Sequence, residues 1–326
     1  MEKRTAPFVW GADISWYPRM REDGFVFRDE RGEPAPLLDT LRGLGVNAIR
    51  LRTWVDPSED RHAGHCGAPE TLAMARECQD AGFRIMIDFH YSDSWADPGQ
   101  QRKPKAWENL PFEALVRQVY EYTRATMRLL TEGGVRVEWA QIGNEINPGM
   151  LLPDGSAEDF GRLSRLITAG HDAVKAVSPG TTTIVHLAEF NRTDFLLGYL
   201  GELDRHGCRY DMPGFSYYPY HLPQMTREAC FAGFRRSMEE LPAALNRDIM
   251  IVETGEISRD EPLTARFLLE QLEAAARQPR CRGIMLWEPE AAACWSHYPL
   301  SAWRDDGAPS SALSAVRDYL ERHPPR

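Results

Sequence analysis

The sequence predicts an α/β fold, a single (β/α)8 TIM barrel that spans residues 1–326 as one domain. Short β-branched runs recur between longer helical patterns along the whole chain, which is typical of βα units around a parallel sheet. Eight such runs are present, and 326 residues are enough for one large α/β barrel. No linker, low-complexity run or internal repeat divides the chain, so the pattern predicts one closed barrel.

The predicted strands follow one another at intervals that leave room for a helix between each pair. We expect them at residues 9–14, 47–52, 84–90, 137–143, 182–186, 214–217, 248–252 and 283–287. Apolar residues at three- and four-residue spacing predict helices at 70–81 and 112–131, and Gly82 is a natural stop for the first. A doubly wound open sheet is the rival fold, but no GxGxxG or GxxxxGK[ST] motif follows the first strand.

Composition excludes several classes of partner. Hydrophobic residues make up 43% of the chain, and 48 acidic against 38 basic residues give a net charge of -10. Because there is no long basic run, we expect no nucleic-acid partner. No segment approaches the roughly 20 apolar residues that span a bilayer, so we expect no membrane association. We expect a monomer.

The first residues and the cysteines bear on compartment and cofactors. Residues 1–7 carry charge without an apolar core, which predicts a cytoplasmic protein, or a secreted one if a native signal segment has been removed. The six cysteines form no CxxC pair, so we expect no zinc site, and nothing in the sequence indicates another metal or a cofactor. Their even number fits disulfides and free thiols equally well.

Two glutamates stand where apolar strands open into loops. Glu145 follows the strand at 137–143, and Glu253 follows the strand at 248–252. A closed barrel brings both to the carboxyl end of the strands, where such folds build their sites. Either one alone fits a cap or an ion pair. Together they fit glycoside cleavage, in which one carboxyl protonates the leaving oxygen and the other attacks the anomeric carbon, with unequal pKa values.

Other strand ends supply candidate neighbours for this pair. Arg50 and Arg52 end the second strand, and a cation beside the nucleophile favours its ionised form. The amide of Asn144 is placed to bond a sugar hydroxyl, and the hydroxyl of Tyr218 to donate to the nucleophile. His90 fits a structural histidine equally well. Trp287 taken alone fits core packing better.

Tryptophan use also favours a sugar ligand. Of the nine tryptophans, six fall in loop-like stretches, namely Trp16, Trp54, Trp95, Trp107, Trp295 and Trp303. Aromatic faces stack on the C–H faces of sugars, although a buried structural role remains the alternative for any single one.

At these residues the chain resembles glycoside hydrolase family 53, the endo-β-1,4-galactanases of a large (β/α)8 clan of retaining glycosidases. The matching stretches run in order over nearly the whole chain, and DFHYSDSWADPG is the most specific of them. They are GADIS at 11–15, GVNAIRLRTWVDP at 45–57, DFHYSDSWADPG at 88–99, IGNEI at 142–146, SYYP at 216–219, VET at 252–254 and WEP at 287–289.

The resemblance implies roles for individual residues. It implies that Glu145 is the acid/base and Glu253 the nucleophile, acting on β-galactan or galacto-oligosaccharides. It further implies a set of substrate-binding residues, which are Asp13, Arg50, His90, Trp95, Asn144, Tyr218 and Trp287.

The chain departs from the family pattern around the last three strands. Residues 220–223 lack the tryptophan of an aromatic-rich stretch, residues 290–293 lack one behind WEP, and Gly255-Glu256 replaces an aromatic after the nucleophile. The stretch 257–264 leads almost directly into a helix, so we expect no calcium site there. The alternatives are another β-linked glycan or short galactosides as substrate, and a non-catalytic carbohydrate-binding barrel, which retention of both glutamates disfavours.

Overall fold

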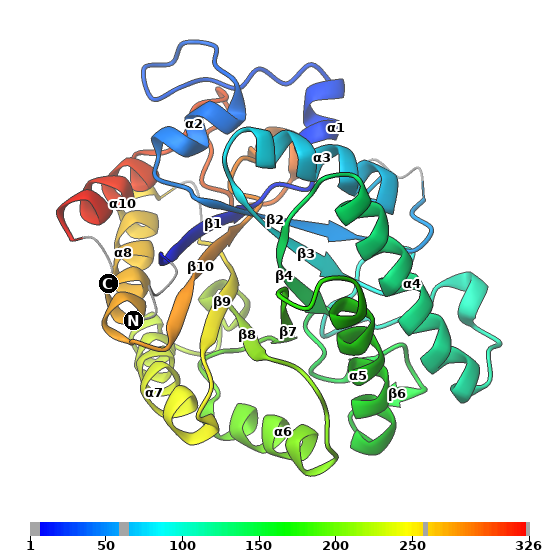
Figure 1. Cartoon of the computed structure of the whole chain (residues 1–326). Coiled ribbons are helices and arrows are strands. Elements are labelled where there is room, and N and C mark those ends of the chain that lie inside the picture. Colours follow the sequence, from blue (N-terminus) through cyan, green and yellow to red (C-terminus); the bar gives the residue numbers. More distant parts are fainter. Residues whose placement is uncertain (1–6, 59–64, 257–259, 324–326) are drawn as a thin grey trace, which may run out of the picture.

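The computed structural model describes residues 7–58, 65–256 and 260–323. Eight parallel strands close into a barrel in the order β1-β10-β9-β8-β7-β4-β3-β2, with helices outside it (Figure 1). The barrel strands are β1 Val9–Asp13, β2 Ala48–Thr53, β3 Arg84–Phe89, β4 Val137–Ile142, β7 Thr182–Leu187, β8 Met212–Tyr217, β9 Ile249–Thr254 and β10 Cys281–Trp287. The predicted (β/α)8 barrel is confirmed.

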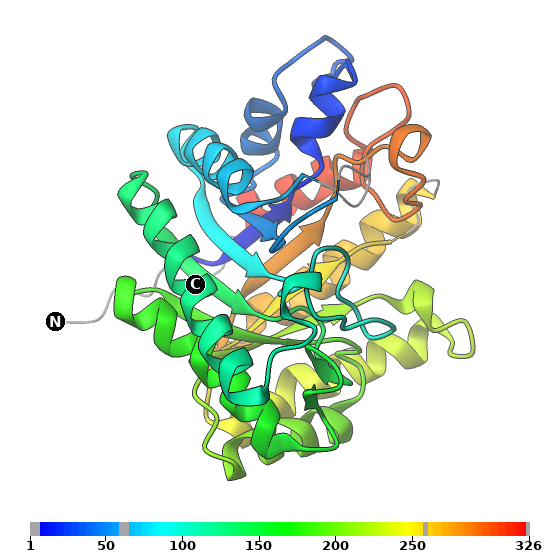
Figure 2. The ribbon, with the colours of Figure 1, turned by 90° about the vertical axis from the view of Figure 1, so that its right-hand side faces the viewer.

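The connections are less regular than strict alternation. Two helices lie between β1 and β2. A short antiparallel hairpin precedes α5, and its two strands, β5 Gly149–Met150 and β6 Gly155–Ser156, have two residues each. The helices are α1 Tyr17–Glu22, α2 Leu37–Gly43, α3 Ala68–Asp80, α4 Phe112–Glu132, α5 Phe160–Val177, α6 Thr193–Arg205, α7 Arg227–Leu245, α8 Glu261–Arg277, α9 Ala293–Ser296 and α10 Ser311–Arg322. Figure 2 shows the helices flanking the strands from the side.

Most predicted boundaries agree with the structure to within two residues. Helices α3 and α4 match the helices predicted at 70–81 and 112–131. Gly82 follows α3 with φ of 91°, the left-handed conformation in which glycine ends a helix. Strand β8 begins at Met212 rather than at Gly214, because Pro213 pairs with Val185 within the parallel ladder.

Side chains fill the inside of the barrel. They come from alternate strand positions and form a cluster of their own, made of Val9, Ala48, Met86, Trp139, Ile184, Met212, Met250, Val252 and Met285. A larger apolar layer lies between the strands and the helices. Gly11 has no room for a side chain, since a Cβ there would lie 2.9 Å from Met285 Cγ and 3.0 Å from the Ala48 carbonyl oxygen. The barrel is therefore a packed core, and ligands meet it at its ends.

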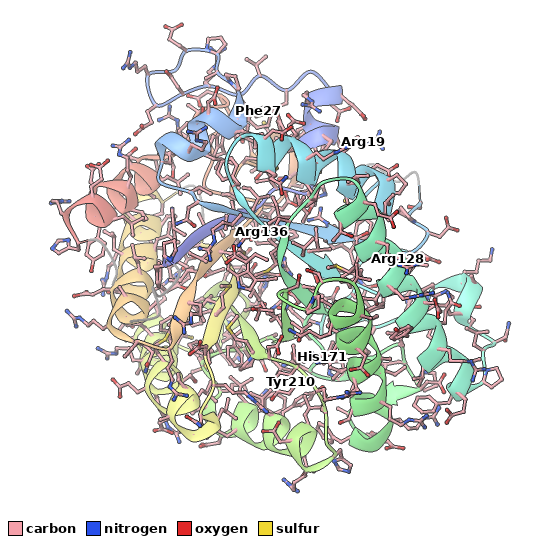
Figure 3. All side chains as sticks on the ribbon, in the orientation of Figure 1. Arg19, Phe27, Arg128, Arg136, His171 and Tyr210 are labelled. Atoms are coloured by element: carbon pink, nitrogen blue, oxygen red, sulfur yellow. The ribbon has the colours of Figure 1, made fainter. Side chains whose placement is uncertain are left out.

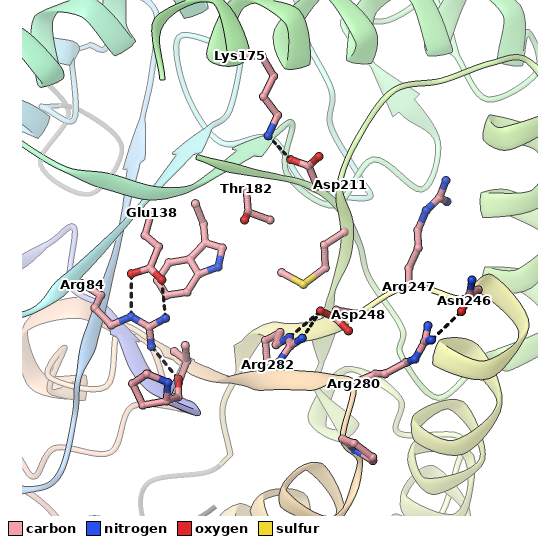
Figure 4. Close-up of a pocket in the computed structure, with 15 residues that line it drawn as sticks. Arg84, Glu138, Lys175, Thr182, Asp211, Asn246, Arg247, Asp248, Arg280 and Arg282 are labelled. Atoms are coloured by element: carbon pink, nitrogen blue, oxygen red, sulfur yellow. Dashed lines mark hydrogen bonds and ion pairs between the residues drawn. The ribbon is translucent and has the colours of Figure 1, made fainter. Parts of the chain in front are cut away.

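The amino-terminal end of the barrel carries an open hollow of about 820 Å³ (Figure 4). Six of its charged side chains form ion pairs within it, which are Arg84–Glu138 at 2.6 Å, Lys175–Asp211 at 2.6 Å and Arg282–Asp248 at 2.5 Å. Two further arginines also have partners, since Arg247 pairs with Asp204 and Arg280 donates to the Asn246 side-chain oxygen. Charged side chains also project from the outer faces of the helices (Figure 3). Both features suit solvated surfaces, and the chemistry of this fold belongs to the opposite end.

The structure answers one question that the sequence left open. All six cysteines are free thiols, and only Cys294 is exposed.

Among the described residues, no helix combines the length and the apolar character that crossing a membrane requires. The prediction about residues 1–7 falls mainly on residues 1–6, and the calcium prediction partly on 257–259. Those residues lie outside the described ranges.

Candidate active site

The two predicted carboxylates meet at the carboxyl end of the barrel. Glu145 lies three residues beyond β4, and Glu253 is the penultimate residue of β9. Ligand atoms of Glu145, Glu253 and His186 all lie within 4.8 Å of one another. This separation suits the retaining geometry of about 5–5.5 Å and leaves no room for the water of an inverting enzyme. Glu145 has φ of 46°, a strained conformation for a residue other than glycine, and such strain tends to occur at functional sites.

The carboxylates face a pocket of about 210 Å³. That volume is below the roughly 300–1,000 Å³ of most ligand sites, and it suits one sugar unit better than a long stretch of chain. Five predicted substrate-binding residues line it, namely His90, Trp95, Asn144, Tyr218 and Trp287. The structure adds four residues that the sequence did not single out, Ala96, Asp97, His221 and Tyr298.

Arg50 and Asp13 lie beneath the pocket rather than in its wall. Arg50 is fully buried, with Nη1 2.7 Å from Asp13 Oδ2 and Nη2 2.7 Å from Glu253 Oε1. The other oxygen of Asp13 accepts a 2.7 Å hydrogen bond from the Ser15 hydroxyl. Asp13 is 0% exposed and already paired, so it supports Arg50, and Arg50 in turn pairs with Glu253. The cation that the sequence led us to expect beside Glu253 is therefore Arg50.

Hydrogen bonds within the protein fix the side chain of Asn144 and leave one of its N–H groups for a ligand. Its Oδ1 accepts from Arg50 Nη2 at 2.9 Å and from Gln141 Nε2 at 3.1 Å. Its Nδ2 donates to the Ala96 carbonyl at 2.7 Å. An amide nitrogen carries two hydrogens, so one remains for a sugar hydroxyl.

His186 was missed by sequence reasoning, although a histidine within the apolar strand β7 was a visible signal. Its Nδ1 lies 2.8 Å from Asn144 Oδ1 and its Nε2 lies 2.6 Å from Ser216 Oγ. Burial, with the charge of Arg50 acting in the same direction, lowers the pKa of His186 well below its usual value. Because both ring nitrogens have partners, His186 positions Asn144, and the cluster with Glu145 and Glu253 is a poor metal site.

His90 has a partner for each ring nitrogen. Nε2 lies 2.8 Å from Asp88 Oδ2, and Nδ1 accepts from the Ala96 backbone N–H at 3.4 Å. His90 therefore lines the pocket, while its two ring nitrogens are used in contacts with Asp88 and Ala96. Asp88 also accepts from Arg50 at 2.8 Å, and Arg50 pairs with Glu253, so His90 is linked to Glu253 through these two residues.

The environments of the two glutamates differ. Burial raises the pKa of Glu145, and the charge of Glu253 raises it further. Burial also raises the pKa of Glu253, but the Arg50 guanidinium opposes the shift. The hydroxyl of Tyr218 donates to Glu253 Oε2 at 3.3 Å, as predicted from the sequence. Glu145 therefore holds a proton more readily, and Glu253 is the carboxylate kept ionised.

Arg52 contacts Glu288 and the tryptophans around the pocket, whereas Arg50 is the arginine that pairs with Glu253. Arg52 pairs with the buried carboxylate of Glu288. Its guanidinium lies 4.7 Å from the Trp95 ring centre, 5.3 Å from Trp16 and 5.7 Å from Trp287. These are cation–π distances, so the charge of Arg52 orders the tryptophans that border the pocket. The expectation that Arg52 assists the nucleophile is wrong.

The loop tryptophans divide into two groups. Trp16 contacts Trp95, Trp287 and Trp295, with ring centres 5.2–6.0 Å apart. Trp54 is fully buried behind the pocket, 5.2 Å from Trp95. Two others lie elsewhere and are structural: Trp107 contacts Tyr122, and Trp303 donates to the Gly307 carbonyl at 2.7 Å. Of these six tryptophans, Trp95 lines the pocket, whereas Trp16 and Trp54 are only 5% and 0% exposed. The prediction of an aromatic cleft is therefore right for Trp95, and the structural alternative holds for Trp54, Trp107 and Trp303.

Comparison with known proteins agrees with this geometry. The profile of Glycosyl hydrolase family 53 matches residues 9–270. Arabinogalactan endo-beta-1,4-galactanase A of Emericella nidulans is 33% identical over 255 residues, covering 75% of this chain and 69% of that protein. An uncharacterized protein of Niallia circulans is 34% identical over 256 residues, covering 76% of this chain and 67% of that protein.

Solved structures give the same result. The family 53 catalytic domain of Ignisphaera aggregans superposes with a TM-score of 0.87 at 29% identity, covering 97% of both chains. A fungal β-1,4-galactanase structure superposes with a TM-score of 0.86 at 25% identity, covering 96% of this chain and 99% of the other. With the paired carboxylates in place, the chain belongs to glycosyl hydrolase family 53 and is a glycoside hydrolase.

Proposed function

We propose that this protein hydrolyses β-1,4-galactosidic bonds in galactan or its oligosaccharides, with retention at the anomeric carbon. The observation that carries the proposal is the approach of Glu145 and Glu253, within 4.8 Å, at the ends of β4 and β9. The curated relatives named arabinogalactan endo-beta-1,4-galactanase support the choice of galactan.

In the first step, the carboxylate of Glu253 attacks the anomeric carbon of the galactosyl unit above it. The bond from that carbon to the glycosidic oxygen breaks, and Glu145 gives its proton to the departing oxygen. Arg50, 2.7 Å from Glu253, and Tyr218, 3.3 Å from it, hold the nucleophile in place. The product of this step is a glycosyl ester on Glu253 and a shortened chain end.

In the second step, water attacks the same anomeric carbon. Glu145, now ionised, takes a proton from the water as its oxygen bonds to the sugar, and the ester bond to Glu253 breaks. Two displacements at one carbon restore its configuration. Asn144 lines the pocket, and its remaining N–H is suited to hold a sugar hydroxyl through both steps.

We also propose that the protein acts as a monomer, because one chain supplies every residue described around the pocket. Light scattering after gel filtration tests this, with a mass near 37.1 kDa as the expected result.

The experiment that tests the function compares linear β-1,4-galactan with mannan, xylan and β-glucan, with products resolved by size. We expect short galacto-oligosaccharides from galactan alone, and NMR of the first products should show the β-anomer. Cleavage of another glycan without cleavage of galactan would overturn the substrate assignment. Binding of galactan without any products would indicate a non-catalytic barrel.

A further inference from the structure

Tyr298 is a pocket residue that the two-carboxylate mechanism does not use. It lies in the segment between β10 and α10, and its ring centre is 4.7 Å from that of Trp287, at 81°. Its hydroxyl shares a hydrogen bond with the hydroxyl of Tyr218, the residue that donates to Glu253. The Tyr298 hydroxyl oxygen is closed to solvent, so water does not compete for this bond. Tyr298 is therefore in contact with the group that holds the nucleophile.

Gly255 gives the Tyr298 hydroxyl its place beside the nucleophile strand. A Cβ at Gly255 would lie 2.8 Å from the Tyr298 hydroxyl oxygen and 2.9 Å from the Leu300 carbonyl oxygen. Gly255 stands two residues beyond Glu253, at one of the places where the chain departs from the family pattern. The glycine leaves space there, and the Tyr298 phenol, which comes from a distant segment, fills it.

The turn that carries Tyr298 is fixed by its own hydrogen bonds. The Ser296 hydroxyl donates to the Ala291 carbonyl at 2.7 Å and accepts from the Tyr298 backbone N–H at 3.0 Å. His297 between them has φ of 58°, which reverses the chain. The ring of Tyr298 is therefore held independently of its hydroxyl, and removal of that one oxygen isolates the hydrogen bond.

The direction of the two hydrogen bonds follows from the number of protons. Burial raises the pKa of Tyr218 and of Tyr298 well above the usual value, so each phenol keeps its single proton. The carboxylate of Glu253 only accepts, and the Tyr218 hydroxyl donates to its Oε2 at 3.3 Å. The Tyr218 oxygen is then left to accept from Tyr298. The two phenols thus form a directed chain that ends on the nucleophile.

Such a chain affects the nucleophile in two ways. A hydroxyl that accepts one hydrogen bond donates more strongly in another, so Tyr298 strengthens the bond from Tyr218 to Glu253. While Tyr298 donates, the Tyr218 proton also cannot turn toward the Tyr298 oxygen. Both effects keep a donor on Oε2 of Glu253, opposite the Arg50 guanidinium on Oε1.

We propose that Tyr298 is a positioning residue, which directs the Tyr218 proton to the Glu253 carboxylate and so keeps that carboxylate ionised and aimed at the anomeric carbon. This inference rests on the proposed function, because it concerns the nucleophile of that reaction. A residue that only packed against Trp287 would not change the ionisation of Glu253.

The test compares the pH profile of kcat/KM in the wild type, Tyr218→Phe, Tyr298→Phe and the double variant. The substrate is a 2,4-dinitrophenyl β-1,4-galactobioside, whose leaving group needs no proton, so the acidic limb reports Glu253 rather than Glu145. On that limb, relative to the plateau, we expect Tyr218→Phe to lose about 2- to 10-fold, as for one net hydrogen bond. Tyr298→Phe should lose a smaller factor in the same direction, and adding it to Tyr218→Phe should change nothing further.

Two controls keep this comparison sharp. Tyr120→Phe removes the same atom from the outer helix α4 and should keep the wild-type profile. Thermal unfolding of each variant checks that it is folded. The other titratable and charged groups that act on Glu253 are the same in all of these proteins, and they are Asp13, Arg50, Asp88, His90 and Glu145.

An unchanged acidic limb in Tyr298→Phe, or a loss that is equal at every pH, would overturn the inference while leaving the function intact. Losses on the limb that add fully in the double variant would also overturn it. A wild type inactive on galactan and on the aryl galactobioside would instead overturn the proposed function.

Discussion

Arg50 Nη2 lies 2.7 Å from Oε1 of Glu253 and 2.8 Å from Oδ2 of Asp88, so one buried guanidinium joins the nucleophile to a buried acid of β3. These carboxylates, together with Asp13, raise the pKa of Arg50 against the effect of burial, and its charge is permanent. The charge of Arg50 therefore favours the ionised form of Glu253 and opposes the effect of burial on its pKa. The predictions below follow from this arrangement.

Replacing the nucleophile should abolish turnover and open space for a small anion. We expect Glu253→Ala to show no detectable release of oligosaccharides from galactan, because no covalent intermediate can form. Added azide should restore cleavage of activated aryl galactosides and give the α-galactosyl azide, since a single displacement inverts the anomeric carbon. NMR of the product checks the configuration. A β-configured product, or near-normal activity without azide, would contradict the assignment of Glu253.

Replacing the acid should affect substrates according to their leaving group. Glu145→Ala should lower kcat/KM on galactan by roughly 10²–10⁴-fold, the usual contribution of a general acid. A dinitrophenyl leaving group needs no proton, so the first step on such a substrate should survive, and a burst of dinitrophenol should precede slow turnover. Stopped-flow absorbance measures the burst. Equal loss on both substrates would argue against Glu145 as the acid.

The pH profile of kcat/KM should be bell-shaped, with limbs set by the two glutamates. Activity falls at low pH as Glu253 takes up a proton, and at high pH as Glu145 loses its proton, whose pKa burial raises. Tyr218→Phe removes a donor to the Glu253 carboxylate, so the pKa of Glu253 should rise. We therefore expect the acidic limb to move to higher pH in this variant, measured on galactan.

The control for this measurement is Tyr120→Phe on helix α4, which should keep the wild-type profile. An acidic limb that stays in place in Tyr218→Phe would show that the 3.3 Å contact does not stabilise the carboxylate.

Glu290 should make stability depend on pH. It is fully buried, and its carboxyl group shares a hydrogen bond with the buried carboxyl group of Glu288. Burial raises its pKa well above 4.5, and the charge of Glu288 raises it further. Above pH 4.5 the unfolded chain releases this proton while the folded protein retains it, so folding stability falls as pH rises.

Glu290→Gln removes this ionisation. The Tm of the variant relative to the wild type should therefore increase steadily as the pH is raised from about 4.5. Differential scanning calorimetry across that range measures the difference, with the exposed Glu239→Gln as the matched control. A Tm difference that does not change with pH would mean that Glu290 is ionised in the folded protein.

Local patterns were enough to predict the barrel and its two carboxylates. The alternation of β-branched runs and helical periods is encoded in neighbouring residues, so the eight strands, α3 and α4 are visible in the sequence. The rule that barrel sites lie at the carboxyl ends of strands then selected Glu145 and Glu253 without any coordinates. The same rule selected Tyr218, whose contact with Glu253 the structure confirms.

Contacts between distant segments decided the rest. Closure of β1 onto both β10 and β2 brings Glu288 to Arg52 and Asp13 beneath the pocket, and no local pattern carries that information. Trp303 lies in a loop-like stretch, and the sequence therefore favoured it as a cleft residue. In the structure its segment folds back, so Trp303 is only 1% exposed.

The sequence by itself determined the fold, the family and the pair of carboxylates, because each depends on local periodicity or on short motifs at strand ends. Only the tertiary structure decided which polar groups the protein satisfies internally and which it leaves for a ligand. That distinction separates Asp13, whose oxygens are fully occupied, from Asn144, whose side-chain nitrogen keeps one N–H for a ligand. Hydrogen-bond satisfaction is a property of groups brought together across the whole chain, so it appears only once the barrel has closed.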